Sequence, residues 1–354
     1  MQENHFFKAF LAALFMILGF VLFWEYHWRH LGFPISYNDD KVVWATERQK
    51  IYLPPDKTTV FIGDSRVKFD INLKTWKSVT GEEAVQLALV GTSPRPTLLD
   101  LARDERFRGK VVMGASEPAF YSMDSMLRER SARDGIEYYK NETPAQKLNE
   151  QIDFLLESKL VFLEEGKFGL NNLLTEMNIP NRSGIVTRGL PPKRFAFYSR
   201  ARQATITEMF FKDSMLRNQV INYWAMGAAL NKSKPIQGDT LEAYFNLLKN
   251  AIARIKARGG RVIMIRPPST GSVLAREKKS YPREQYWDRL LKYTGMDGIY
   301  YSDYPDMAFF TCPEESHLSP ADAAAYTKAL IRILKEKNWF TFEVSDSLNN
   351  RLTR

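Results

Sequence analysis

Short apolar runs alternate with longer amphipathic stretches from about residue 58 to residue 337. The runs have the length and bounding residues of buried strands, and they are TTVFIG at 58–63, AVQLALVG at 84–91, KVVMGA at 110–115, RVIMIRPP at 261–268 and, more weakly, GIYYSDY at 298–304. Helical periodicity lies between them, most clearly at 73–79, 96–107, 241–260 and 319–337. In the last of these, Ser319 is the expected N-cap and Pro320 the first helical residue. Alternating strands and helices predict an α/β fold around a parallel sheet.

A different pattern precedes this region. Residues 6–24 are apolar and have the length, about 20 residues, that a helix needs to cross a bilayer. Lys8 near the start of the run and Trp24, Tyr26 and Trp28 at its end are typical of interfacial anchors. A cleaved signal peptide and a buried core helix are the alternatives, but EYHWRH follows the run where a cleavage site would have small residues. We predict a tail and uncleaved signal anchor in 1–28, in the inner (cytoplasmic) membrane.

The remaining chain divides by composition. Residues 29–57 read as a juxtamembrane linker, 58–340 as one domain, and 341–354 as a polar tail. The interval from about 120 to 240 is too long for a plain connection and is interpreted as a helical insertion. It contains a basic stretch with interleaved aromatic residues, which either meets an anionic glycan or lipid surface or is a solvated loop. The members of this stretch are Arg182, Arg188, Lys193, Arg194, Phe195, Phe197, Tyr198, Arg200 and Arg202.

Composition narrows the classes of function. The chain has 354 residues and a net charge of +9, which favours acidic partners. Neither zinc-finger spacing nor an RNA-binding aromatic signature accompanies the charge, so no nucleic-acid partner is expected. Cys312 is the single cysteine, and no EF-hand spacing or nucleotide-binding glycine motif follows a predicted strand, so no metal or cofactor is expected.

Candidate chemistry lies where the predicted strands end, because ligands of open parallel sheets bind at the carboxyl ends of the strands. Gly63-Asp64-Ser65 ends the first strand, and it is either an ordinary turn or a serine nucleophile presented at a helix start. Gly91-Thr92-Ser93 ends the second strand, and the third ends in GASE, residues 114–117. Glycines at such ends allow close backbone approach to a ligand.

A serine nucleophile needs a base, and the histidines restrict the choice. His5, His27 and His30 flank the membrane run, which leaves His317, on the loop before the last helix. Glu314 lies three residues upstream and could orient the imidazole. A surface-loop histidine is the alternative, but Ser65 and the nearby carboxylate favour a base.

These motifs resemble the SGNH (GDSL-like) hydrolase family over about residues 58–337. Gly63-Asp64-Ser65 matches the first block, with Ser65 as nucleophile, and Gly91 matches the oxyanion glycine of the second. Two blocks depart from the family: Ser116 and Glu117 stand where it has Asn and Asp, and Glu314 stands where it has an Asp before His317, with Asp303 and Asp306 as nearby substitutes. The resemblance implies a flavodoxin-like three-layer sandwich and an oxyanion hole made by Ser65, Gly91 and Ser116.

The resemblance further implies a membrane-anchored serine esterase or O-acyltransferase that acts on an acylated envelope polymer or exopolysaccharide. The short tail before the membrane run and the large domain after it predict that this domain lies outside the cytoplasm, in the periplasm. The chain is similar to the SGNH proteins that work beside membrane-bound O-acyltransferases in alginate acetylation and D-alanylation. A non-catalytic partner of such an acyltransferase is the alternative. Arg266 is a candidate for binding an anionic substrate group, with Asp64 and Glu117 beside it, and a purely structural ion pair among these residues is equally compatible with the sequence.

Overall fold

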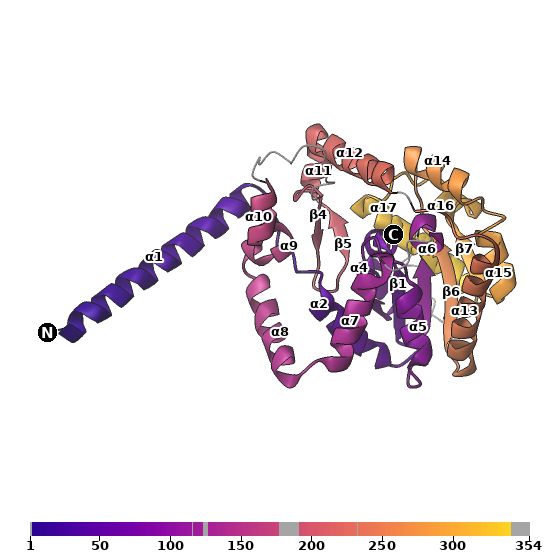
Figure 1. Ribbon diagram of the computed structural model, residues 1–354, viewed down its shortest axis with the longest axis horizontal. Helices are drawn as coiled ribbons and strands as arrows, with labels where there is room; N and C mark the ends of the chain where they lie inside the picture. The colour runs from indigo at the N-terminus through magenta and orange to yellow at the C-terminus, as the bar shows by residue number, and fades with distance from the viewer. Residues whose placement is uncertain (1, 115, 123–126, 177–190, 232, 341–354) are drawn as a thin grey trace.

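A five-stranded parallel sheet lies at the centre of the computed structural model, which describes residues 2–114, 116–122, 127–176, 191–231 and 233–340 (Figure 1). Its strands, in the spatial order β2-β1-β3-β6-β7, are β1 (Thr58–Gly63), β2 (Glu83–Gln86), β3 (Lys110–Gly114), β6 (Arg261–Arg266) and β7 (Asp297–Tyr300). Every apolar run predicted to be a strand takes part in this sheet. The prediction of an α/β fold around a parallel sheet is therefore confirmed.

The second strand is shorter than predicted, because regular pairing stops at Gln86. The next residues nevertheless stay against β1, since the N–H groups of Leu87 and Leu89 donate to the carbonyls of Phe61 and Gly63 at 2.8 and 3.0 Å. The chain thus runs beside β1 up to the level of Gly63.

Two groups of helices pack on the sheet. The helices that follow the strands are α3 (Ser65–Asp70), α4 (Leu73–Thr80), α5 (Arg95–Arg103), α6 (Glu117–Tyr121), α13 (Gly238–Ala257), α14 (Gly271–Ser280), α15 (Trp287–Thr294), α16 (Pro305–Ala308) and α17 (Pro320–Glu336), with the 3₁₀ turn η4 (Tyr301–Asp303). Helix α17 packs against α3 and α4, whereas α13 packs against α5 and α15. Because right-handed crossovers leave β1 and β3 in opposite directions, the two groups cover opposite faces. The strand order reverses between β1 and β3, which opens a crevice at their carboxyl ends.

Two glycines are paired at this crevice because the space there is too small for a side chain. Gly63 and Gly114 are register partners at the ends of β1 and β3. A Cβ on Gly63 would lie 2.0 Å from the Gly114 carbonyl oxygen and 2.5 Å from Val67. Only glycine therefore lets the segment after β1 turn into α3 this close to β3.

The described residues between 127 and 231 form helices and one hairpin, and the first of these α-helices packs on α2 (Lys41–Gln49) and α5 of the main domain. The elements are η2 (Leu127–Glu129), α7 (Arg130–Asn141), α8 (Pro144–Glu157), η3 (Val161–Leu163), α9 (Glu165–Phe168), α10 (Leu170–Glu176), β4 (Ala196–Tyr198), β5 (Ala204–Ile206), α11 (Glu208–Lys212) and α12 (Ser214–Leu230). Strand β4 lies within the basic stretch, for which a solvated loop was one alternative, and its antiparallel partner β5 follows directly after that stretch. Phe195, Ile206 and Phe210 form a small core with Phe69 of α3, which attaches this region to the sheet domain.

Helix α1 (Gln2–His30) projects from the domain (Figure 1). Its stretch from His5 to His30 is long and apolar enough to span a membrane. The segment expected to be a linker instead contains α2 (Lys41–Gln49) and η1 (Lys50–Tyr52). Trp44 of α2 is fully buried in the main core and donates its indole N–H to the Leu87 carbonyl at 3.0 Å, so this segment is part of the fold. The predicted tail, 341–354, lies outside the described residues.

Candidate active site

Ser65 is the first residue of α3, directly after β1. Asp64 is the N-cap of this helix, and its Oδ1 accepts the N–H of Arg66 at 3.0 Å. An N–H in the first turn of a helix has no intrahelical acceptor, so the backbone N–H of Ser65 remains available for a ligand. The side chain of Ser65 is partly exposed, while Asp64 is buried.

Three side chains form a continuous series of hydrogen bonds at this point. The hydroxyl Oγ of Ser65 lies 2.8 Å from Nε2 of His317, and Nδ1 of the same imidazole lies 2.7 Å from Oε1 of Glu314. His317 and Glu314 are both buried. This is the geometry of a serine nucleophile, its base and the carboxylate that orients the base.

The loop before α17 holds this arrangement in place. Oε1 of Glu314 also accepts the backbone N–H of His317 at 2.6 Å, so the extra methylene relative to Asp is accommodated by folding the side chain back on its own loop. Oδ1 of Asp70 accepts the N–H of Leu318 at 2.9 Å. Ser319 caps α17 as predicted, with its hydroxyl accepting the Asp322 N–H at 3.1 Å. These hydrogen bonds, made just before and just after His317 in the chain, fix the loop that carries the imidazole.

The proposed substitutes for Glu314 lie elsewhere. Asp303 forms an ion pair with Arg283 at 2.5 Å, and Asp306 forms one with Arg332. Both carboxylates are largely exposed. Glu314 is therefore the carboxylate that the structure brings to His317.

The surroundings of His317 raise the pKa of its imidazole. Burial alone would lower its pKa, but the charge and hydrogen bond of Glu314, together with the charge of Asp70, raise the pKa above its ordinary value of 6.5. Aromatic rings surround the imidazole, with centroids 4.4 Å away for Phe69, 6.4 Å for Phe195 and 5.9 Å for Trp224. Phe195 and Trp224 come from the insertion, so that region covers the base.

The predicted oxyanion residues lie in different settings. Gly91 follows the segment that runs beside β1, is exposed, and has a left-handed φ of +66°. Ser116 follows β3, and both its backbone N–H and its hydroxyl donate to Oδ2 of Asp64, at 2.8 and 2.6 Å. The Ser116 hydroxyl proton therefore points at a carboxylate and is not free for an oxyanion.

The substrate-binding candidates are bonded to one another. Arg266 donates two hydrogen bonds to Glu117, at 2.9 and 3.0 Å, and one to Glu277 at 2.6 Å. Glu277 also accepts from Arg66 at 2.5 Å and from Ser269 at 2.8 Å. Of the two possibilities that the sequence left open for Arg266, the structural ion pair is the one formed, and Asp64 is likewise occupied by α3 and Ser116.

Sequence reasoning missed two acidic residues near this edge. Glu277 lies on α14, which was not among the predicted helices, and Asp70 is the last residue of α3. Both are buried, and burial raises the pKa of Asp70 to about 7. In the sequence, only the short distance of Asp70 from Ser65 and of Glu277 from Arg266 indicates a role for them, and many unrelated acidic residues have such spacing.

The basic stretch is only partly exposed in the described region. Arg182 and Arg188 fall outside the described residues. Arg202 is buried and donates to Asp39 and to the carbonyls of Gln86 and Ala88, at 2.8, 2.7 and 3.3 Å. Within the described part of the chain, His, Cys, Asp and Glu side chains form no group of three or more that could hold a metal ion.

Comparison with known proteins adds no relative. A scan against models of protein families matches none of them, and a search of curated proteins finds no similar chain.

Proposed function

We propose that the protein is an SGNH-type serine esterase or O-acyltransferase, anchored by α1 with its domain outside the cytoplasm. One observation carries this proposal: the series Ser65–His317–Glu314, with 2.8 and 2.7 Å between successive partners, at the carboxyl end of β1. A buried imidazole joined to both a serine hydroxyl and a carboxylate is the arrangement that activates an alcohol as a nucleophile.

The topology supports the same proposal. The strand order β2-β1-β3-β6-β7 is that of a flavodoxin-like sheet, and helices cover both of its faces. Ser65 lies beside the point where the strand order reverses, which is where ligands of such sheets bind. A three-layer SGNH hydrolase fold accommodates both observations.

The reaction would proceed in two acyl transfers. As Ser65 Oγ attacks the carbonyl carbon of an ester, His317 Nε2 takes the hydroxyl proton, and Glu314 stabilises the imidazolium. The N–H groups of Ser65 and Gly91 would donate to the oxyanion of the tetrahedral intermediate. Collapse breaks the ester bond, the leaving alcohol takes the proton from His317, and an acyl group remains on Ser65. An acceptor hydroxyl, deprotonated by His317, then attacks the acyl carbon. The bond between this carbon and Ser65 Oγ breaks, and His317 returns the proton to Ser65.

The acceptor decides the name of the activity. Water makes the protein an esterase, and a sugar hydroxyl makes it an O-acyltransferase. The net charge of +9 suits an anionic polymer, and the anchor suits a polymer of the cell envelope or an exopolysaccharide.

One observation favours a second proposal, a non-catalytic partner that binds or presents polymer for a membrane-bound O-acyltransferase. The Ser116 hydroxyl is bound to Asp64 at 2.6 Å, so the side-chain oxyanion donor of the third block is missing. Losing a donor of that kind costs about 10² to 10³ in rate. Such a protein would still bind polymer at the crevice.

Ester turnover by the full-length protein in detergent or nanodiscs distinguishes the two proposals. We expect wild type to hydrolyse p-nitrophenyl acetate, and Ser65→Ala and His317→Ala to lose about 10³-fold or more of that rate. Ser78→Ala, an exposed serine on α4, is the matched control and should retain the rate. A folded wild-type protein without turnover that still binds an acetylated polysaccharide would favour the non-catalytic partner.

A further inference from the structure

Helix α8 exposes most of its large apolar side chains and buries two of its three acidic side chains. Its buried residues are Glu150, Phe154 and Glu157. Leu148, Ile152 and Leu155 are 61%, 49% and 64% exposed. Positions 148, 152 and 155 share one face of a helix, so the exposed leucines and isoleucine form a continuous stripe.

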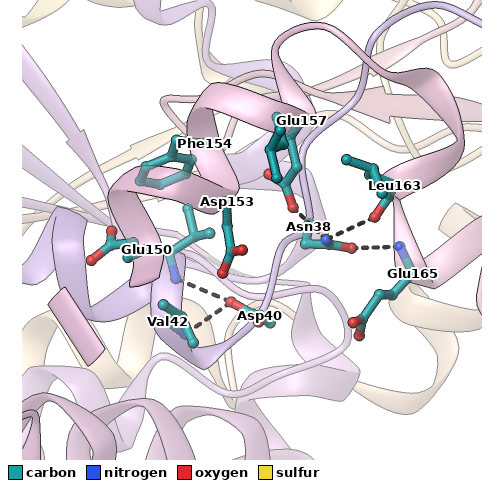
Figure 2. A pocket seen from close by; sticks show the side chains of 11 residues that line it. Asn38, Asp40, Val42, Glu150, Asp153, Phe154, Glu157, Leu163 and Glu165 are labelled. Carbon is teal, nitrogen blue, oxygen red and sulfur yellow. Dashed lines mark hydrogen bonds between the residues drawn. The ribbon is translucent and has the colours of Figure 1, made fainter. Parts of the chain in front are cut away.

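Specific contacts hold the acidic face inward. Asn38 donates to Oε1 of Glu157 at 2.5 Å and accepts the Glu165 N–H at 2.8 Å (Figure 2). The cleft between α8 and the start of α2 has a volume of about 210 Å³ and is lined by Asp40, Glu150 and Glu157, among others. Burial raises the pKa of both Glu150 and Glu157 to about 7. In water this arrangement is unfavourable on both faces, so the outer face is expected to have an apolar cover.

Helix α10 also exposes two leucines. Leu170 and Leu174 are 71% and 46% exposed. Helices α8 and α10 lie on the side of the domain from which α1 extends, and α8 runs crosswise to α1 (Figure 1). A helix crosswise to a membrane-spanning helix lies along the membrane plane.

The end of α1 is bonded to the chain between these two helices. Glu25 accepts the Val161 N–H at 2.8 Å, and Arg29 donates to the Lys159 carbonyl at 2.8 Å. The rings of Trp28 and Phe168 lie 4.6 Å apart. The segment from α8 to α10 is therefore fixed at the point where α1 leaves the bilayer.

We infer that the apolar face formed by Leu148, Ile152, Leu155, Leu170 and Leu174 lies in the interfacial region of the phospholipid bilayer that α1 spans. Its continuity with the anchor identifies the lipid as the cover. Amphipathic helices bind this region with their apolar faces among the headgroups and upper acyl chains. The contact is a second attachment beside α1, and it fixes the orientation of the domain relative to the membrane. It rests on the anchor and not on the proposed catalysis.

Site-specific fluorescence in vesicles tests this inference. In full-length protein with Cys312→Ala, the environment-sensitive dye NBD is attached at Leu155→Cys, at Leu148→Cys, or at Lys278→Cys on α14 as the matched control. The proteins are reconstituted into phosphatidylethanolamine–phosphatidylglycerol vesicles at a dilution that leaves most vesicles with a single copy. Thermal unfolding confirms that each variant is folded, and the two leucine positions substitute for one another if one variant fails to fold.

The expected result is a blue-shifted emission at positions 148 and 155, with quenching by lipids that carry a nitroxide near the headgroup several-fold stronger than at position 278. Iodide in the aqueous phase should quench position 278 preferentially. Equal iodide quenching at all three positions would overturn the inference, because the face would then be in water. Protection from iodide without quenching by the lipid nitroxide would also overturn it, because protein would then be the cover.

Discussion

Asp64 accepts two hydrogen bonds from Ser116 on one carboxylate oxygen, the N–H at 2.8 Å and the hydroxyl at 2.6 Å. The other oxygen of Asp64 caps α3 at Arg66. A single buried carboxylate therefore joins the end of β1 to the segment after β3 and sets the start of the helix that carries Ser65. Ser116 therefore acts on the position of Ser65, and in the proposed reaction the oxyanion would be bound by backbone donors alone.

This relationship predicts a small effect for Ser116→Ala. The variant keeps the backbone N–H bond to Asp64 and loses only the hydroxyl bond, so kcat/KM for an ester substrate should fall by less than about 10-fold. Steady-state kinetics would measure it. A fall in kcat/KM of about 10² to 10³ is typical of a missing oxyanion donor and would show that Ser116 belongs to the oxyanion hole.

The contact between Glu314 and His317 predicts a pH effect. A base must be neutral to accept the serine proton, so activity should rise with pH through the raised pKa of His317, with a midpoint above the ordinary value of 6.5. Glu314→Gln removes the charge that raises this pKa. The midpoint should move to lower pH while the maximal rate falls by about 10²-fold or more.

Glu315→Gln is the matched control for that profile. Glu315 is the next carboxylate on the loop and accepts the Ser272 hydroxyl at 2.6 Å, away from His317. Its substitution should leave the midpoint unchanged. If Glu314→Gln also left the midpoint unchanged, Glu314 would not be the partner of the imidazole.

The burial of Asp70 predicts a pH-dependent stability. Its pKa is raised by burial from 3.8 to about 7, so the folded state binds more protons than the unfolded state between these values. The stability associated with the protonated carboxyl is complete below the unfolded pKa and is lost as the pH rises through about 7. Asp70→Asn should therefore raise the free energy of unfolding by roughly 1 to 3 kcal/mol near pH 8 and give no gain near pH 4.

Urea unfolding at the two pH values would measure this difference. Asp134→Asn, at an exposed position on α7, is the control and should show no such pH dependence. An Asp70→Asn variant that is destabilised equally at both pH values would show that the carboxylate is needed in its charged form.

Much of this architecture follows from simple patterns in the sequence. The five apolar runs became the five strands because buried parallel strands need continuous apolar residues. The histidine count pointed to His317, and the strand ends pointed to Ser65, because a parallel sheet brings such ends to one edge. These features depend on residues close together in the chain or on the general rules of parallel sheets.

Other features depend on long-range pairing and carry little local signal. The basic Arg202 is turned inward because the carbonyls of Gln86 and Ala88 need donors there. The strands of the β4–β5 hairpin have three residues each, too few for a period to be seen. Glu277 lies on α14, a helix whose buried residue is an acid and which therefore lacks an apolar stripe.

That acid predicts a large effect on stability. Glu277 bridges the buried guanidinium groups of Arg66 and Arg266 at 2.5 and 2.6 Å. Burial alone would raise its pKa, but the two arginine charges hold it below its ordinary value. Glu277→Ala leaves both cations short of a partner and should cost about 3 to 5 kcal/mol.

Chemical unfolding monitored by tryptophan fluorescence would measure that cost. Glu284→Ala, at an exposed position between α14 and α15, should change the free energy of unfolding by less than about 0.5 kcal/mol. An equally small change for Glu277→Ala would mean that water or Glu117 alone compensates the two arginines.

The central claim is that Ser65 is a nucleophile activated by His317, and the most direct measurement is the site of covalent labelling. Full-length protein is treated with a fluorophosphonate and digested, and the modified peptide is identified by mass spectrometry. The account predicts a single adduct on Ser65, lost in Ser65→Ala and strongly slowed in His317→Ala. A folded protein that carries no adduct, or one whose adduct lies on another residue, would contradict it.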